Sequence, residues 1–229
     1  MDNLPTNKSS GDAAQQIGKA VLSAVPIAGG PLAVLFENIF TAPLEKRKQA
    51  WLEQLAGVIN ELQTRVEDLT PEKLSENEAF ITVTLQASQI ALRNHQSEKL
   101  NALRAAILHS ALPNAPEENL QQIFLRLIDQ LTPWHLGILA MLHDPVHWML
   151  KNEISNPNWG MGGVSTVIEH CFPQLKGQRE LYDHIVRELQ AESLIMQGNF
   201  LHVTMSRTGM IDSRTTKIAA TFLHFITDD

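Results

Sequence analysis

Histidines and one cysteine are the residues of this sequence whose chemistry suits metal binding or covalent catalysis. His143 and His147 are four residues apart in "HDPVH", a spacing that brings two side chains onto one side of a helix. Pro145 lies between them and is expected to begin a new helix, which separates the pair. No Glu follows in the frame of a helical zinc site, and no third ligand is evident. We therefore predict no metal site and no cofactor.

The only cysteine of the chain, Cys171, directly follows His170. Adjacent residues on a helix point in different directions, so this pair does not make the thiol and base of a nucleophilic site. His184 could approach either of them, but nothing in the sequence places it there. A small buried residue is the plainer interpretation of Cys171. We predict no catalytic residue and a protein that is not an enzyme.

Five basic residues near the C-terminus are candidates for contact with a nucleic acid. Lys and Arg supply the phosphate contacts on which DNA affinity depends. Acidic residues nevertheless outnumber basic ones from residue 116 onward, which disfavours DNA as a partner. The candidates are Arg179, Arg187, Arg207, Arg214 and Lys217.

An uncharged stretch, "AVLSAVPIAGGPLAVLF", covers residues 20–36. Small and apolar residues recur at helical spacing on both sides of its Pro-Gly-Gly-Pro centre, which predicts two short helical arms that end near residue 40. Neither arm reaches the ~20 residues of a membrane-spanning helix, and the stretch lacks the Lys-Ser/Thr of a phosphate loop. Two interpretations stay open: the arms pack against the next helix, or they enter a membrane interface. The apolar residues concerned are Val21, Val25, Ile27, Leu32, Leu35, Phe36, Ile39 and Phe40.

Helices are predicted for the rest of the first half. A long amphipathic helix covers residues 41–69, and a capping box at Ser75 predicts another helix over about 76–94. Ser97 is the predicted cap of a third helix. The apolar side of the long helix is a candidate oligomer surface, with Trp51, Leu55, Leu62 and Val66.

The second half begins after "LPNAP", at which we place a domain boundary. Helices are predicted from Pro116, from Pro133 with Thr132 as cap, and from Pro145 with Asp144 as cap. Two more cover 164–172 and 178–194. Alternating residues over 200–205 predict a strand, 206–217 a polar loop, and the chain closes as a helix.

The order of helices, a helix ending in "LQAESLI", a short hairpin and a terminal helix resembles bacterial winged-helix domains. The residues that carry the resemblance are "IVRELQAESLI" and "HVTMSRTGMIDSRTTKIAATFLHFI", and it covers residues 116–227. It implies that the helix over 178–194 is the third helix, which commonly enters the DNA major groove. The pieces "PIAGGPLAVLF" and "PLEKRKQAWL" resemble a small bacterial family with an apolar Gly-Gly-Pro hairpin. This second resemblance implies no activity.

Composition and charge limit which fold and which function are possible. The chain has 229 residues, a net charge of −7 and 44% apolar residues. We predict a mainly α fold: a disordered tail over 1–11, a helical domain over 12–112 and a winged-helix-like domain over 116–229. A single cysteine fits a reducing compartment, so we expect a cytoplasmic protein. The alternative expectation is a protein that is peripheral to the inner membrane.

The leading hypothesis is a non-enzymatic regulatory or interaction module that binds a protein partner or itself. No small-molecule substrate is evident. A membrane-active, toxin- or defence-like effector using residues 20–40 and a DNA-binding regulator are the alternatives.

Overall fold

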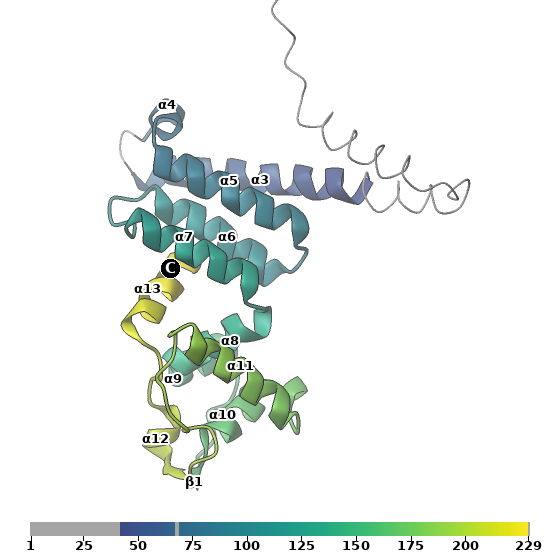
Figure 1. Cartoon of the computed structure of the whole chain (residues 1–229), viewed down its shortest axis with the longest axis vertical. Helices are drawn as coiled ribbons and strands as arrows, with labels where there is room; N and C mark the ends of the chain where they lie inside the picture. The colour runs from purple at the N-terminus through teal and green to yellow at the C-terminus, as the bar shows by residue number, and fades with distance from the viewer. Residues whose placement is uncertain (1–41, 67–68, 229) are drawn as a thin grey trace, which may run out of the picture. The chain divides into compact units, whose positions relative to one another are not determined.

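The computed structural model of the chain describes residues 42–66 and 69–228 (Figure 1). Two compact units divide the chain, residues 1–57 and residues 58–229. The described residues form eleven α-helices, one 3-10 helix and one antiparallel sheet of two strands, which confirms the predicted mainly α fold. The predicted tail over 1–11 and the predicted hairpin over 20–40 lie outside the described residues.

The long helix predicted for the first half is α3 (Ala42–Arg65). Pro43 lies in its first turn, where a missing N–H costs nothing, and Glu45 in the same turn interacts favourably with the helix dipole. Arg65 in the last turn interacts favourably with the opposite, negative end of the helix dipole. The helix ends four residues earlier than predicted.

Two helices follow where one was predicted, α4 (Pro71–Ser75) and α5 (Glu78–Arg93). Asn77 caps α5, because its side-chain oxygen accepts a backbone N–H three residues on at 3.0 Å. The capping box predicted at Ser75 is wrong: this residue ends α4, and its hydroxyl donates to the carbonyl of Glu72 at 2.6 Å.

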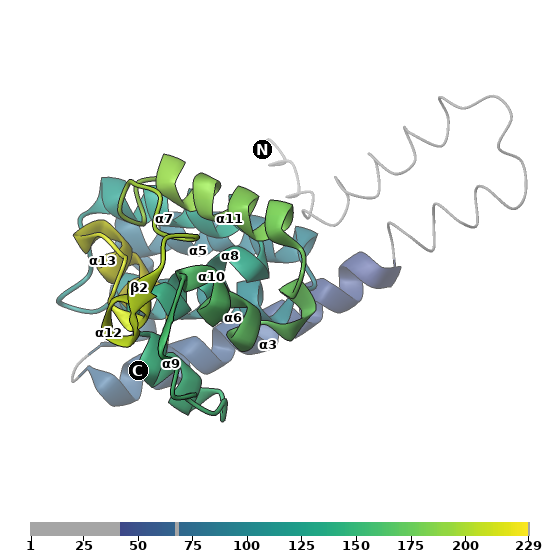
Figure 2. The same ribbon diagram turned by 90° about the horizontal axis from the view of Figure 1, so that it is seen from below.

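Helices α5, α6 (Ser97–Ser110), α7 (Glu118–Gln130) and α13 (Lys217–Ile226) pack together (Figures 1 and 2). Ser97 is the first residue of α6 and not its cap. The cap is Gln96, whose side chain makes no capping hydrogen bond. The largest fully buried side chains of these helices form their common core: Leu103, Ile107, Leu108, Phe124, Leu125, Leu127, Ile128, Phe222 and Phe225.

The terminal helix α13 packs on α6 and α8. The rings of Phe222 and Phe225 lie 5.2 and 5.5 Å from the ring of Phe124 on α7. Arg104 of α6 also bonds to Asp228, just after α13. The predicted division near residues 112–116 stays a prediction, and α13 is the element that joins the two sides of it.

Helices α8 (Pro133–His143), α9 (Pro145–Lys151), α10 (Val164–Cys171) and α11 (Arg179–Ala191) form the rest of the second half, with a 3-10 turn at Pro173–Leu175. Both predicted caps are confirmed. The side chains of Thr132 and His135 form a reciprocal capping box at α8, and Asp144 accepts the N–H of His147 at 2.9 Å at the start of α9. These caps also separate His143 from His147, as predicted.

The sheet differs from the prediction. Strand β1 (Met161–Gly162) pairs with β2 (Met205–Ser206). The partner of β2 therefore precedes α10, whereas both strands of the predicted hairpin follow the helix that is now α11. Most of the strand predicted over 200–205 is irregular, because these residues bond to helices: the N–H of Ser165 donates to the carbonyl of Leu201 at 3.0 Å. The polar loop predicted over 206–217 contains a short helix, α12 (Arg207–Ile211).

Candidate interaction surface

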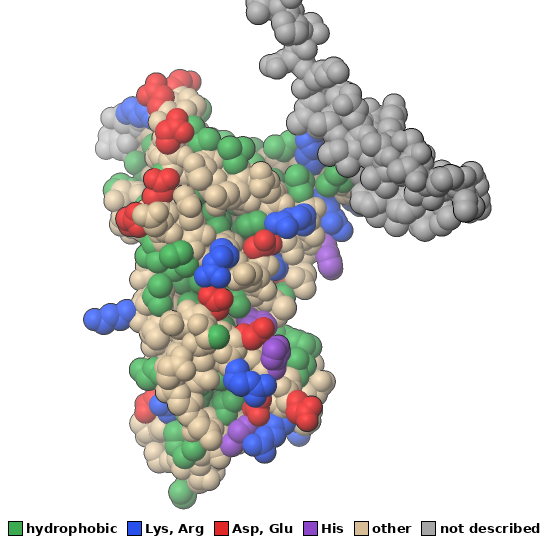
Figure 3. All heavy atoms as spheres, viewed as in Figure 1, with side chains coloured by type: hydrophobic (Ala, Val, Ile, Leu, Met, Phe, Trp, Pro, Cys, Tyr) green, Lys and Arg blue, Asp and Glu red, His purple; other side chains and the backbone are tan. Residues whose placement is uncertain are grey.

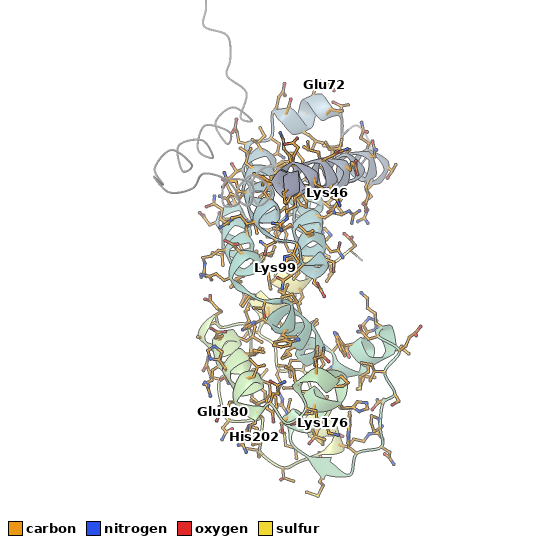
Figure 4. All side chains as sticks on the ribbon, turned by 90° about the vertical axis from the view of Figure 1, so that its right-hand side faces the viewer. Lys46, Glu72, Lys99, Lys176, Glu180 and His202 are labelled. Atoms are coloured by element: carbon orange, nitrogen blue, oxygen red, sulfur yellow. The ribbon has the colours of Figure 1, made fainter. Side chains whose placement is uncertain are left out.

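Three charged residues of α11, the predicted third helix of a winged helix, contact partners within the chain: Arg179, Asp183 and Glu188. Asp183 lies 2.8 Å from the Nε2 of His202 and 3.7 Å from the guanidinium of Arg179. Figure 4 places His202 and Glu180 on the same side of the molecule, at α11. Arg179 is therefore partly neutralised, and this weakens it as a phosphate contact.

Glu188 joins α11 to α8. Its two oxygens lie 2.8 Å from the Nε2 of His135 and 3.5 Å from that of His184. His135 is buried, and its Nδ1 accepts the N–H of Thr132 at 3.3 Å. The same Nδ1 lies 2.7 Å from the hydroxyl of Thr132, so both ring nitrogens of His135 have partners within the chain. His184, for which the sequence left the position relative to His170 and Cys171 open, lies beside Glu188.

Arg214 is turned into the fold. Its guanidinium donates to the carbonyl of Gly209 at 2.5 Å and to the sulfur of Met205 at 3.3 Å, and lies over the ring of Phe200 at 5.6 Å. Its backbone N–H donates to the carbonyl of Leu142 at 2.9 Å. A guanidinium with these partners positions the segment around β2, and it is not oriented to grip a phosphate backbone.

The remaining basic candidates are exposed. Arg207 donates to the side-chain oxygen of Asn158 at 2.9 Å, whereas the side chains of Arg187 and Lys217 form no hydrogen bond or ion pair with another described residue. The five predicted residues therefore do not form one basic surface. Only Arg187 and Lys217 are unengaged within the part of the chain that the structure describes.

Cys171 is buried, and burial raises the pKa of its thiol to about 12. A thiol with such a pKa is a poor nucleophile at neutral pH. Its neighbour His170 faces elsewhere: the Nε2 donates to the carbonyl of Ser155 at 2.7 Å, and the ring meets Trp159 edge-on. Among the described residues, no group of three or more His, Cys, Asp or Glu is arranged to hold a metal ion.

Two segments without Lys, Arg, Asp or Glu meet at the sheet. They are residues 154–168 and 193–206, and we call the surface that they build the charge-free end. β1 and β2 pair them, and the Ser165–Leu201 bond continues the contact. Gly163 allows the close approach, because a Cβ at this position would lie 2.5 Å from the carbonyl oxygen of Leu201.

Large apolar side chains are exposed on the charge-free end. Met161 is 74% exposed and Val203 is 48% exposed, and Met196 is exposed further along the second segment. Figure 3 shows hydrophobic and uncharged side chains around the position of β1 on the face in view. Centres of protein interfaces are depleted in charged residues and enriched in Met, whose flexible side chain adapts to a partner. The geometry of this end suits contact with another protein.

The sequence prediction missed Met161 and Val203. The signal that could have found them is the pair of charge-free runs, each as long as a whole helix in a chain that is 19% charged. That the two runs are neighbours in space depends on β1 pairing with β2, which the alternation over 200–205 did not reveal.

The predicted oligomer surface on α3 is only partly exposed. Leu62 is 0% exposed and Trp51 is 4% exposed, so neither side chain is available to a second copy; Leu55 and Val66 are half-buried. This corrects the prediction for Trp51 and Leu62: the apolar stripe of α3 marks residues that are buried within the chain. No helix among the described residues has the length and apolar character needed to cross a bilayer.

Comparisons with protein-family models, with curated proteins and with solved structures find no match to the chain.

Proposed function

We propose that the protein is a non-enzymatic interaction module of the bacterial cytoplasm and that its charge-free end contacts a protein partner. The observation that carries this proposal is the exposure of Met161 and Val203 at the junction of two segments without charged residues. The two segments carry no charge of their own, and the guanidinium of Arg207 that lies on them is bonded to Asn158. Exposed apolar side chains on a surface with so few charges are typical of an interaction site. The buried thiol of Cys171 and the bonds that His135, His170 and His202 make within the chain argue for binding over catalysis.

We also propose a winged-helix arrangement for the region from α9 to β2. A strand, two helices and a second strand that pairs with the first follow one another in β1, α10, α11 and β2, an order typical of that fold. In this arrangement the charge-free end includes the wing. Winged helices used for protein contacts need no basic surface.

The test compares three forms of the full chain as bait for co-purifying proteins. Met161→Asp combined with Val203→Asp introduces charge at the charge-free end, and a charge desolvated at an interface is costly. Leu150→Asp is the matched control, because Leu150 on α9 is as exposed as Met161. We expect a partner that binds the wild type and the control and is lost from the double variant. Identical co-purifying proteins from all three forms would contradict the proposal.

DNA binding is the second candidate, favoured by the winged-helix order and by the exposed Arg187 and Lys217. A titration of duplex binding against salt tests it, since each phosphate contact contributes to the salt dependence. Changing Arg187 and Lys217 to Glu should abolish such binding. Duplex binding with unchanged affinity in this variant would remove α11 and the start of α13 from consideration.

The membrane-active alternative rests on residues 20–40 alone. Flotation of the full chain with anionic vesicles tests it: association would favour this alternative, and no association under any condition tried would remove it.

A further inference from the structure

The methionines of this chain differ widely in their exposure to solvent. All of them except Met1 lie in the described residues. Met161 is 74% exposed and Met196 is 50% exposed, and both belong to the two segments that build the charge-free end. Three others are at most 1% exposed: Met141, Met149 and Met210. Among the described residues, the thioethers that solvent reaches most readily therefore lie on one surface.

The remaining methionine, Met205, provides an internal reference. It lies in β2 on the same segment as Met196, but its side chain is half-buried. Its sulfur accepts a bond from the guanidinium of Arg214 at 3.3 Å. Susceptibility to oxidation follows exposure, and an oxidant is attacked by a sulfur lone pair, so an engaged and half-buried sulfur reacts more slowly than an open one.

The only cysteine does not compete for an oxidant. Peroxides react with the thiolate form of cysteine, which is the nucleophile. Cys171 is 4% exposed, and burial raises the pKa of its thiol to about 12, so the thiol stays protonated at neutral pH. Within the described part of the chain, the exposed thioethers are therefore the sulfur atoms that a peroxide meets first.

Oxidation changes the character of a methionine side chain. A sulfur lone pair attacks one oxygen of hydrogen peroxide and the O–O bond breaks. The sulfur is oxidised by two electrons and keeps that oxygen as a sulfoxide, and the peroxide is reduced to one molecule of water. A flexible apolar side chain thereby becomes a polar one. Burying the new acceptor against an apolar surface without a donor is unfavourable, which weakens the contact.

We propose that Met161 and Met196 are oxidation sites at which a peroxide switches off apolar contact through the charge-free end. The switch rests on the proposed function of this end, because it regulates the same surface. Methionine sulfoxide reductases return a sulfoxide to the thioether, so the switch is reversible. Such reversal suits the cytoplasmic location that we propose for the protein.

The first measurement locates the sulfoxides. The full chain is treated with hydrogen peroxide at neutral pH until about one oxygen atom per chain has been added, and its peptides are then mapped by mass spectrometry. We expect Met161 and Met196 to be oxidised at least about tenfold faster than the three buried methionines, with Met205 between the two groups. Equal oxidation of exposed and buried methionines, or oxidation of Cys171 before any methionine, would overturn the assignment of the sites.

Retention on a phenyl resin measures the apolar character of the surface without a protein partner. Oxidised wild type should leave the resin at a higher salt concentration than untreated wild type, because its exposed side chains are more polar. Met161→Leu combined with Met196→Leu is the matched control, since Leu is apolar, similar in volume and free of sulfur. Its retention should not change on the same treatment. Equal shifts in both forms, or no shift in a wild type that carries the sulfoxides, would overturn the switch.

Co-purification separates this inference from the proposed function. The untreated wild type should hold its partner, and peroxide treatment should weaken that binding about tenfold or more, while the treated Leu variant keeps it. A partner held equally before and after treatment of the wild type would contradict the switch and leave the proposed function standing. An untreated wild type without any partner would contradict the proposed function, whereas the mass spectra and the phenyl resin still decide the switch.

Discussion

Single residues of this chain differ most from their sequence interpretation where their partners are distant in sequence. Arg214 was predicted to contact a nucleic acid because it lies in a polar, basic stretch. Its guanidinium instead bonds to Gly209 and Met205 and covers Phe200. Composition alone cannot show this, since the contact with Phe200 requires the segment after α11 to fold back. The interpretation of Cys171 as a small buried residue, by contrast, was predictable, because the adjacent His170 points in a different direction on the helix.

Replacing Arg214 with Met tests its structural role. Met keeps much of the apolar stem but leaves the carbonyl of Gly209 without its charged donor, so we expect a loss of about 1–3 kcal/mol in the free energy of unfolding. Urea titration measures it. Arg207→Met is the matched control: that guanidinium is exposed and bonds to one side chain, so its loss should cost less than about 0.5 kcal/mol. Equal effects of the two substitutions would contradict the assignment.

Cys171 makes a prediction about pH. A thiol whose pKa is raised by burial to about 12 is almost wholly protonated at pH 8, whereas an exposed thiol is partly ionised. Iodoacetamide should therefore label native protein roughly a thousandfold more slowly than urea-unfolded protein at pH 8, because the thiolate is the reactive form. The native rate should rise as the pH approaches 12. Labelling of native and unfolded protein at similar rates would show that the thiol is accessible and ionised.

At the scale of elements, local signals predicted the helices and non-local pairing decided the sheet. Thr132 with Pro133 and Asp144 with Pro145 were readable because a cap and its helix are adjacent in sequence. The prediction at Ser75 failed because Asn77, two residues on, is the stronger cap in its place. The strand over 200–205 failed for another reason: β2 pairs with β1 across α10 and α11, and no local pattern reports such a pairing.

The junction of the two charge-free segments can be tested at Gly163. Its φ of −98° is open to any residue, so alanine adds no backbone strain, but the new Cβ would lie 2.5 Å from the carbonyl oxygen of Leu201. Gly163→Ala should therefore push the segments apart and cost about 1–3 kcal/mol of stability, seen in thermal unfolding. Gly160→Ala is the control, since nothing lies within 4 Å of its added Cβ. A Gly163→Ala protein as stable as this control would mean that the junction is loosely packed.

For the whole molecule, the distribution of charge is more informative than its sum. The net charge of −7 excluded a broadly basic surface from the sequence alone. It could not show that Asp183 and Glu188 of α11 are engaged by Arg179, His135 and His202, nor that the uncharged segments meet at one end. Both depend on tertiary contacts. The same holds for α13, whose apolar stripe was readable but whose packing on α6 was not.

The central claim is that the charge-free end contacts another protein. Photo-crosslinking from single benzophenone side chains in the full chain tests it most directly, with probes at Met161 and Val203 and a control probe at the equally exposed Leu150. We predict a discrete crosslinked product from positions 161 and 203 that is absent from position 150. The same products from all three positions, or none from 161 and 203, would contradict the claim.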